Sequence, residues 1–160
     1  MFIKKTSDGE KISGWSFLRN DRGGCVMSKY TEKAQELRAI VEPHYNCGQS
    51  TAIPFAEGKG LSDETMRNIC ANFGGGLKRK STCGALAGGI TVLGLYGVND
   101  QETIDAYYKA FADNHEGMLD CGPLVADNEA KGNEQKPFCD GLVDESVKLV
   151  EAILKERGLI

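Results

Sequence analysis

Apolar residues recur at every third or fourth position along most of the chain after residue 30, which is the spacing of amphipathic helices. In the segment 31–41, charged residues separate the members of an apolar face formed by Ala34, Leu37, Ile40 and Val41. No segment shows the strict alternation of a half-buried β-strand. We therefore predict an all-α fold, a compact bundle of five or six helices.

Capping residues and helix breakers divide this pattern into separate helices. Asn46, with Gln49 three positions later, predicts the start of a short helix through a variant of the capping box. Pro43 ends the helix before it, and Gly158 ends the last helix. The predicted helical segments are 31–41, a short one from 46, 62–73, 83–96, 102–115, a short turn at 120–127, and 140–156.

The first 26 residues differ from the remainder because they are polar and show no sustained period. We interpret 1–26 as an N-terminal arm and 27–160 as a single helical domain. The sequence Arg22-Gly23-Gly24 is one that a purine-rich ribosome-binding site would encode, just upstream of Met27. Translation from Met27 is therefore one hypothesis, and an arm that packs on the domain is the other.

Charge and hydropathy narrow the class of protein. The net charge of −4 disfavours a nucleic-acid-binding protein, since such proteins present a basic face. The most apolar stretch, 83–98, is too short and too rich in glycine for a membrane span. Residues 1–20 contain no apolar run of the kind that an export signal requires. We expect a cytoplasmic protein, in which thiols stay reduced unless they bind metal or take part in redox chemistry.

Four of the six cysteines fall at predicted helix N-termini: Cys47, Cys83, Cys121 and Cys139. Free backbone N–H groups and the positive end of the helix dipole stabilise an anion there, which favours a thiolate that acts as a ligand or nucleophile. One cysteine at such a position is commonly a small buried hydrophobe, but four favour a shared site. No pair has the C-x-x-C spacing of zinc modules, thioredoxin-like motifs or ferredoxin loops.

Glycines accompany these cysteines, and their role has two readings. Gly84 and Gly88 stand four positions apart and share one face of a predicted helix, where each costs about 1 kcal/mol relative to alanine. Because glycine has no side chain, these two positions permit the close approach either of another helix or of an inorganic core.

The segment 74–82 is glycine-rich, basic and leads into a helix, as phosphate-binding loops do. It lacks the Gly-Lys-Ser/Thr order of a P-loop, so nucleotide binding is disfavoured. We expect its Lys78, Arg79 and Lys80 to stabilise thiolates or a negatively charged cluster, or to dock an acidic partner. A ligand or supporting role is open for His44 and His115, but surface or capping roles are favoured.

The residues that carry a family resemblance are Asn46-Cys47-Gly48-Gln49-Ser50, then Phe73-Gly74-Gly75-Gly76, then Cys83-Gly84-Ala85-Leu86-Ala87-Gly88, and finally Cys121 and Cys139. Over about 29–158 the chain resembles the redox-active protein family named after its C…CGAxxG…C…C pattern (C_GCAxxG_C_C). The resemblance implies redox activity, and bound iron–sulfur clusters are suspected in this family. A related domain stands beside an iron–sulfur centre in a multihaem cytochrome. This chain has no C-x-x-C-H motif, so covalent haem is not expected. Cys25 and Cys70 fall outside the pattern.

The leading hypothesis is a small cytoplasmic electron-transfer protein that binds one iron–sulfur cluster and exchanges electrons with a larger oxidoreductase. The resemblance favours [2Fe–2S] over [4Fe–4S]. The expected metal ligands are Cys47, Cys83, Cys121 and Cys139, and the glycines expected to let the backbone approach the cofactor are Gly74, Gly75, Gly76, Gly84 and Gly88. A cluster shared across a homodimer would use the same cysteines.

Two alternatives remain open. In the first, the protein is a metal-free thiol–disulfide oxidoreductase or redox sensor, and the helix-end thiolates are nucleophiles. In the second, it is a helical interaction module stabilised by Zn²⁺. Neither nucleic acid nor a membrane is an expected partner, and the sequence leaves open whether the protein is an enzyme.

Overall fold

The computed structural model describes residues 27–160, and the predicted arm 1–26 lies outside the described residues. Within 27–160 the chain forms seven α-helices and no β-strand, which confirms the predicted all-α fold. The helices are α1 (Lys29–Ala39), α2 (Cys47–Ala52), α3 (Asp63–Ile69), α4 (Gly84–Leu95), α5 (Gln101–Asn114), α6 (Cys121–Ala130) and α7 (Gln135–Glu156). The short turns η2 (Ile53–Phe55) and η3 (Glu57–Lys59) follow α2, and the irregular turn η4 (Gly76–Lys80) precedes α4. No helix in this part of the chain is long and apolar enough to cross a membrane.

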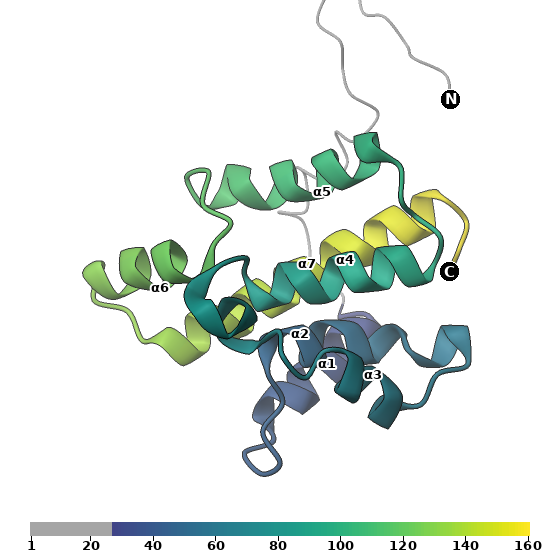
Figure 1. Ribbon diagram of the computed structural model, residues 1–160, viewed down its shortest axis with the longest axis horizontal. Helices are drawn as coiled ribbons and strands as arrows, with labels where there is room; N and C mark the ends of the chain where they lie inside the picture. Colours follow the sequence, from purple (N-terminus) through teal and green to yellow (C-terminus); the bar gives the residue numbers. More distant parts are fainter. Residues whose placement is uncertain (1–26) are drawn as a thin grey trace, which may run out of the picture.

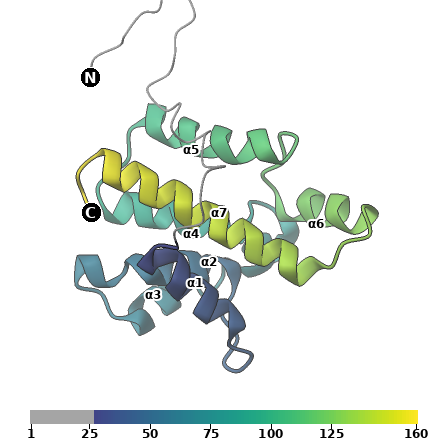
Figure 2. The same ribbon diagram turned by 180° about the vertical axis from the view of Figure 1, so that it is seen from behind.

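The helices are arranged in three layers around a central pair. Helices α4 and α7 run side by side through the middle of the molecule, with α5 on one side and α1, α2 and α3 on the other (Figure 1). The reverse view shows the same order, with α6 extending beyond one end of the central pair (Figure 2). Phe55, Leu86, Tyr107 and Ile153 belong to the single core between these layers and are fully buried. The layering places the N-terminal ends of several helices near one another.

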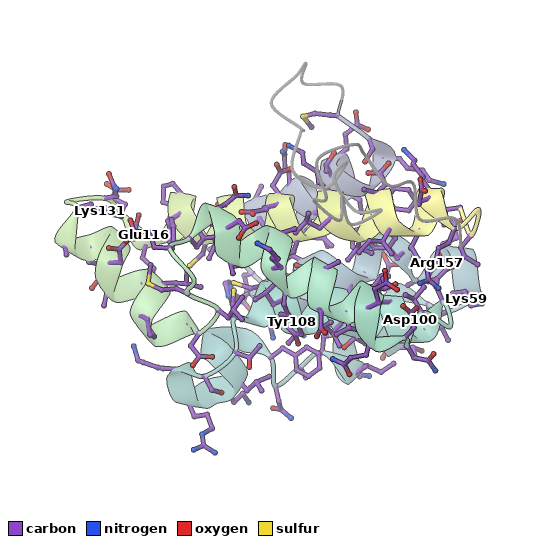
Figure 3. All side chains as sticks on the ribbon, turned by 90° about the horizontal axis from the view of Figure 1, so that it is seen from above. Lys59, Asp100, Tyr108, Glu116, Lys131 and Arg157 are labelled. Atoms are coloured by element: carbon purple, nitrogen blue, oxygen red, sulfur yellow. The ribbon has the colours of Figure 1, made fainter. Side chains whose placement is uncertain are left out.

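An ion pair connects neighbouring segments at each end of the molecule. Arg157, after the last turn of α7, pairs with Asp100, the N-cap of α5. Lys131, which caps α6, pairs with Glu116 in the turn after α5. The two pairs lie at opposite ends of the molecule, as Figure 3 shows. Exposed pairs of this kind contribute little to stability, so the buried core carries the fold.

The predicted cap at Asn46 is confirmed, and two further helices are capped by side chains. The side chain of Asn46 accepts from the backbone N–H of Gln49, and the Gln49 side chain accepts from the backbone N–H of Asn46, which completes the capping box of α2. Ser62 and Asp100 cap α3 and α5 by a single bond each, accepting from the N–H three positions later. These bonds satisfy N–H groups that have no partner within the helix.

The end of α1 differs from the sequence-based expectation. The helix stops at Ala39, and Ile40 adopts an extended conformation, so the apolar face does not continue through residue 41. Ile40 is 39% exposed and Val41 is 84% exposed. Periodicity placed both side chains inward, but the chain leaves the helix before it can present them to the core.

The start of α7 also differs, and this difference moves a cysteine. The helix begins at Gln135, more than one turn before the predicted start at 140. Pro137 falls in the first turn, where its missing N–H costs nothing, and Lys136 pairs with Asp140 one turn later. Cys139 therefore lies one turn inside α7 and not at its first residue.

Glycines allow α2 and α4 to approach at backbone distance. A Cβ atom at Gly88 would lie 2.5 Å from the carbonyl oxygen of Gly48, and one at Gly84 would lie 2.5 Å from that of Phe73. No real Cβ atom tolerates these distances, and the obstructing atoms are backbone that has no freedom to turn aside. The structure thus shows the close approach of another helix, which was one of the two roles that the sequence left open for these glycines. Their role toward a cofactor stays a prediction.

Replacing Gly88 with alanine is expected to destabilise the protein by about 1–3 kcal/mol, because the added methyl group forces α2 and α4 apart. Gly94 is the matched control, since it lies in the same helix with no atom within 4 Å of its Cβ position. Gly94→Ala is expected to stabilise the protein by about 0.5–1 kcal/mol through helix propensity. Urea unfolding measures both free energies, and equal effects of the two substitutions would contradict this account of the packing.

Candidate functional site

The four predicted site cysteines come from four different helices. Cys47 is the first residue of α2, Cys83 is the N-cap of α4, and Cys121 is the first residue of α6. Cys139 is the exception described above, one turn inside α7. All four are recorded as free thiols.

The starts of α4 and α6 are joined by main-chain hydrogen bonds. The N–H of Cys83 donates to the carbonyl of Leu119 at 2.9 Å, and the N–H of Cys121 donates to the carbonyl of Ser81 at 2.7 Å. Together these bonds form an isolated antiparallel bridge between Thr82 and Asp120. The bridge holds Cys83 and Cys121 in neighbouring positions. Local sequence patterns do not predict it, because its two strands are single residues far apart in the chain.

Cys47 and Cys139 form a second pair, and both line the same cavity. A hydrogen bond from the Cys139 thiol lowers the pKa of Cys47 to about 7, against the opposing effect of burial, and the nearby Arg38 guanidinium lowers it further. The pKa of Cys139 lies far above its usual range, first because its thiol is the donor in that bond, and then because of burial. Cys47 therefore becomes the thiolate of the pair and Cys139 keeps the proton.

Burial prevents the other two thiols from ionising readily. Burial raises the pKa of Cys83 to about 11, although the N–H groups of Ala85 and Leu86 point to its sulfur and favour the anion. Burial also raises the pKa of Cys121. The expectation that every helix-end position lowers the cysteine pKa is therefore wrong for these two, because desolvation outweighs the helix terminus.

All four thiols form one cluster. Negative charge on Cys47, Cys121 or Cys83 adds to the elevated pKa of Cys139, and charge on Cys47 or Cys121 adds to that of Cys83. The Cβ position of Gly84 is 3.3 Å from the Cys47 Cβ. The four cysteines that the sequence singled out therefore lie within electrostatic range of one another, in one region of the fold.

The remaining cysteines do not join this cluster. Cys70 caps the end of α3, is fully buried, and has a pKa raised to about 11 by burial. Its carbonyl accepts from the side chain of Asn46 and so supports the start of α2. Cys25 lies outside the described residues.

The glycine loop 74–76 packs against the cluster. The Cβ position of Gly74 lies 2.8 Å from the Cβ of Asn46, and that of Gly76 lies 2.5 Å from the Cβ of Cys121. Gly75 and Gly76 both have positive φ, which only glycine adopts without strain. The loop therefore passes between the start of α2 and the start of α6.

An open cavity of about 730 Å³ lies beside the cluster and exposes the Cys47–Cys139 pair. Its lining residues are Arg38, His44, Asn46, Cys47, Gln49, Ala71, Gly74, Gly75, Lys78, Gln135, Lys136 and Cys139. His115 lies elsewhere, with its Nε2 atom 2.7 Å from the Glu145 carboxylate and its ring against Phe111. Within residues 27–160, no three cysteine, histidine, aspartate or glutamate side chains are arranged to hold a single metal ion.

The family described as "Putative redox-active protein (C_GCAxxG_C_C)" matches residues 45–153, a range that contains all four clustered cysteines. The chain belongs to this redox-active, cysteine-motif family, as the resemblance indicated. It is also 30% identical, over 160 aligned positions, to the UDP-N-acetylmuramoylalanine–D-glutamate ligase of Chlorobaculum tepidum. That alignment covers 93% of this chain and 32% of the ligase, so the chain spans about a third of that relative's length. No solved structure matches the chain.

In the reduced, metal-free protein, alkylation of Cys47 by iodoacetamide is expected to rise with a midpoint near pH 7, because the thiolate is the reactive form and its pKa is lowered from about 9. Cys139→Ala removes the hydrogen-bond donor, so the midpoint should move upward. Cys121→Ala is the matched control and should leave the midpoint in place. Peptide mass spectrometry across a pH series measures the labelling, and an unmoved midpoint in Cys139→Ala would refute the pairing.

Proposed function

We propose that this protein is a small electron-transfer protein whose clustered cysteines, Cys47, Cys83, Cys121 and Cys139, bind one iron–sulfur cluster. The observation that carries the proposal is the convergence of four thiols from four helices at one place in the fold. Four cysteine thiolates are the usual ligand set of [2Fe–2S] and [4Fe–4S] clusters, so the donor set fits the group. The group, when bound, would supply one-electron oxidation and reduction.

The surroundings of the thiols suit anionic sulfur. The N–H groups of Ala85 and Leu86 are directed at the sulfur of Cys83, and Lys80 lowers the pKa of Cys121. N–H donors to sulfur stabilise ligated thiolates and tune the reduction potential of the site. Because three of the four free thiols have raised pKa values, metal binding must release their protons, and affinity should increase with pH.

The thiols also fall into two pairs. Cys47 and Cys139 are joined by a hydrogen bond, and Cys83 and Cys121 are joined through the main-chain bridge. A two-plus-two set suits a [2Fe–2S] cluster, in which each iron takes two cysteines, and we favour it over [4Fe–4S]. Ligands of a cluster bind different iron atoms and need not converge on one point, as the ligands of a single Zn²⁺ must. The arrangement thus supports a cluster over the zinc-stabilised module, and we propose a larger oxidoreductase as the electron partner.

Protein purified without oxygen is expected to contain iron and acid-labile sulfide at about two of each per chain, with visible thiolate-to-iron absorption. Serine substitution of any of Cys47, Cys83, Cys121 or Cys139 should lower both contents. Cys70→Ala is the matched control, since it removes a cysteine outside the cluster, and it should keep them. About one of each per chain would indicate a cluster shared between two subunits. A colourless protein after anaerobic reconstitution, or full content in all four serine variants, would rule the proposal out.

A second candidate function rests on the Cys47–Cys139 pair alone. A thiolate beside a protonated thiol, open to a cavity, is the arrangement of a dithiol that exchanges with disulfides. Cys47 would attack a substrate disulfide and release one thiol, and Cys139 would then displace the second thiol and close a protein disulfide. The two protein thiols lose two electrons and two protons, which the substrate disulfide gains.

For this second function, mild oxidation of metal-free protein with a small disulfide is expected to link Cys47 specifically to Cys139. Cys139→Ala should instead trap a mixed disulfide on Cys47, because the resolving thiol is missing. Cys121→Ala is the control and should still form the link. Mass spectrometry of unreduced peptides measures the products, and random pairing among the four cysteines would exclude a dedicated dithiol.

A further inference from the structure

We propose that the cavity beside Cys47 and Cys139 binds a small molecule that carries a carboxylate or phosphate group, held by Arg38, Lys78 and Lys136. This assigns a ligand site that the electron-transfer proposal does not include. The bound molecule would lie in contact with the redox cysteines, since both line the cavity.

The size and lining of the cavity suit a small anion. Its volume of about 730 Å³ lies in the range of small-molecule sites and exceeds that of a single inorganic ion. Cations reach it from three elements, Arg38 from α1, Lys78 from η4 and Lys136 from α7. None of the residues that line it is an aspartate or a glutamate. This concentration of positive charge contrasts with the net charge of −4 of the chain.

Arg38 provides a buried and partly unused guanidinium group. Its side chain is only 9% exposed. The Nε atom donates to the Asp140 carboxylate at 2.6 Å, and Nη1 donates to the carbonyl of Tyr45 at 2.9 Å. Nη2 has no hydrogen-bond partner among residues 27–160, so its donors remain for a ligand. A fixed guanidinium edge matches the geometry of a carboxylate or a phosphate.

The two lysines add positive charge to the lining of the cavity. Lys136 donates to Asp140 at 2.7 Å and to the carbonyl of Arg38 at 3.2 Å, which anchors its ammonium group near the guanidinium. Lys78 forms no ion pair within the described chain. Asp140 and the Cys47 thiolate, which lines the cavity near Arg38, together balance two of the three positive charges, and the remaining charge favours an anionic occupant.

Of the three basic residues on η4 only Lys78 lines the cavity, which favours a small molecule as the occupant over an acidic segment of a partner protein. Arg79 and Lys80 are exposed on the same turn, η4, but they do not line the cavity. An acidic protein surface would engage these protruding cations together with Lys78. A small anion bound in the cavity would depend on Lys78 and not on them.

The test titrates the full-length protein, as purified, with citrate, inorganic phosphate and the neutral polyol glycerol at constant ionic strength, followed by NMR of labelled backbone amides. We expect saturable shifts at residues around Cys47 and Cys139 with citrate, phosphate or both, and none with glycerol. Saturation by citrate alone identifies a carboxylate ligand, and saturation by phosphate alone identifies a phosphate ligand. Absence of saturable binding by both anions overturns the proposal.

Two matched variants locate the site. Lys78→Asn removes a cation that lines the cavity, and Lys80→Asn removes one from the same turn that does not. Both lysines have positive φ, which asparagine tolerates, so both variants should fold alike. We expect the Kd to weaken about fivefold for Lys78→Asn and to remain unchanged for Lys80→Asn. Equal weakening in both variants overturns the cavity site in favour of a protein-docking surface.

A third variant tests the guanidinium itself. Arg38→Lys keeps the charge but removes the planar fork, and it should weaken binding severalfold while the helical circular-dichroism signal is unchanged. Iron and sulfide are measured on the same samples. Anion binding by protein that never acquires iron would leave this inference intact and defeat the electron-transfer proposal, whereas iron without anion binding would do the reverse.

Discussion

The backbone contact between α2 and α4 positions the rest of the site. Gly48 and Gly88 let the two helices approach until a Cβ atom would lie 2.5 Å from a carbonyl oxygen. At that separation the first residue of α2 and the N-cap of α4 become neighbours, which brings Cys47 and Cys83 together. Larger side chains at this contact would move the helices apart and separate the thiols. The fold therefore gives up helix propensity at these glycines and gains a fixed distance between two cysteines.

Polar tethers then bring the other two cysteines to this pair. The Arg38–Asp140 ion pair joins α1 to α7 just beyond Cys139, and the Thr82–Asp120 bridge joins α6 to α4 beside Cys121. Burial follows from this convergence, and it acts against ionisation. At Cys83 burial outweighs the helix N–H groups, whereas at Cys47 the hydrogen bond from Cys139 outweighs burial. The site thus contains one thiolate, at Cys47, and three thiols that keep their protons.

Much of this architecture could be predicted from local patterns, and what could not depends on contacts distant in sequence. The helices, the capping box at Asn46 and the choice of four cysteines follow from periodicity and from residue types at helix ends. The exposure of Val41 and the early start of α7 depend on where the chain leaves or enters a helix, which periodicity defines poorly. The Cys47–Cys139 pair depends on how α2 meets α7. The helix termini predicted a lowered pKa for each of the four cysteines. This prediction failed at Cys83 and Cys121 because burial, which is a property of the assembled fold, raises the pKa there.

The turn η4 places positively charged side chains at the site, although its backbone conformation is strained. Leu77, Lys78 and Lys80 all have φ near +57°, between 56° and 59°, a region in which each non-glycine residue costs roughly 1 kcal/mol or more. Glycine at these positions would remove the strain but also the side chains. The hydrogen bonds from the N–H and the hydroxyl of Ser81 to the carbonyl of Gly76 hold the turn closed. As a result Lys80 faces Cys121 and Lys78 lines the cavity at Cys47. The strained turn thus places Lys80 near one pair of cysteines and Lys78 near the other, where positive charge favours a thiolate over a thiol.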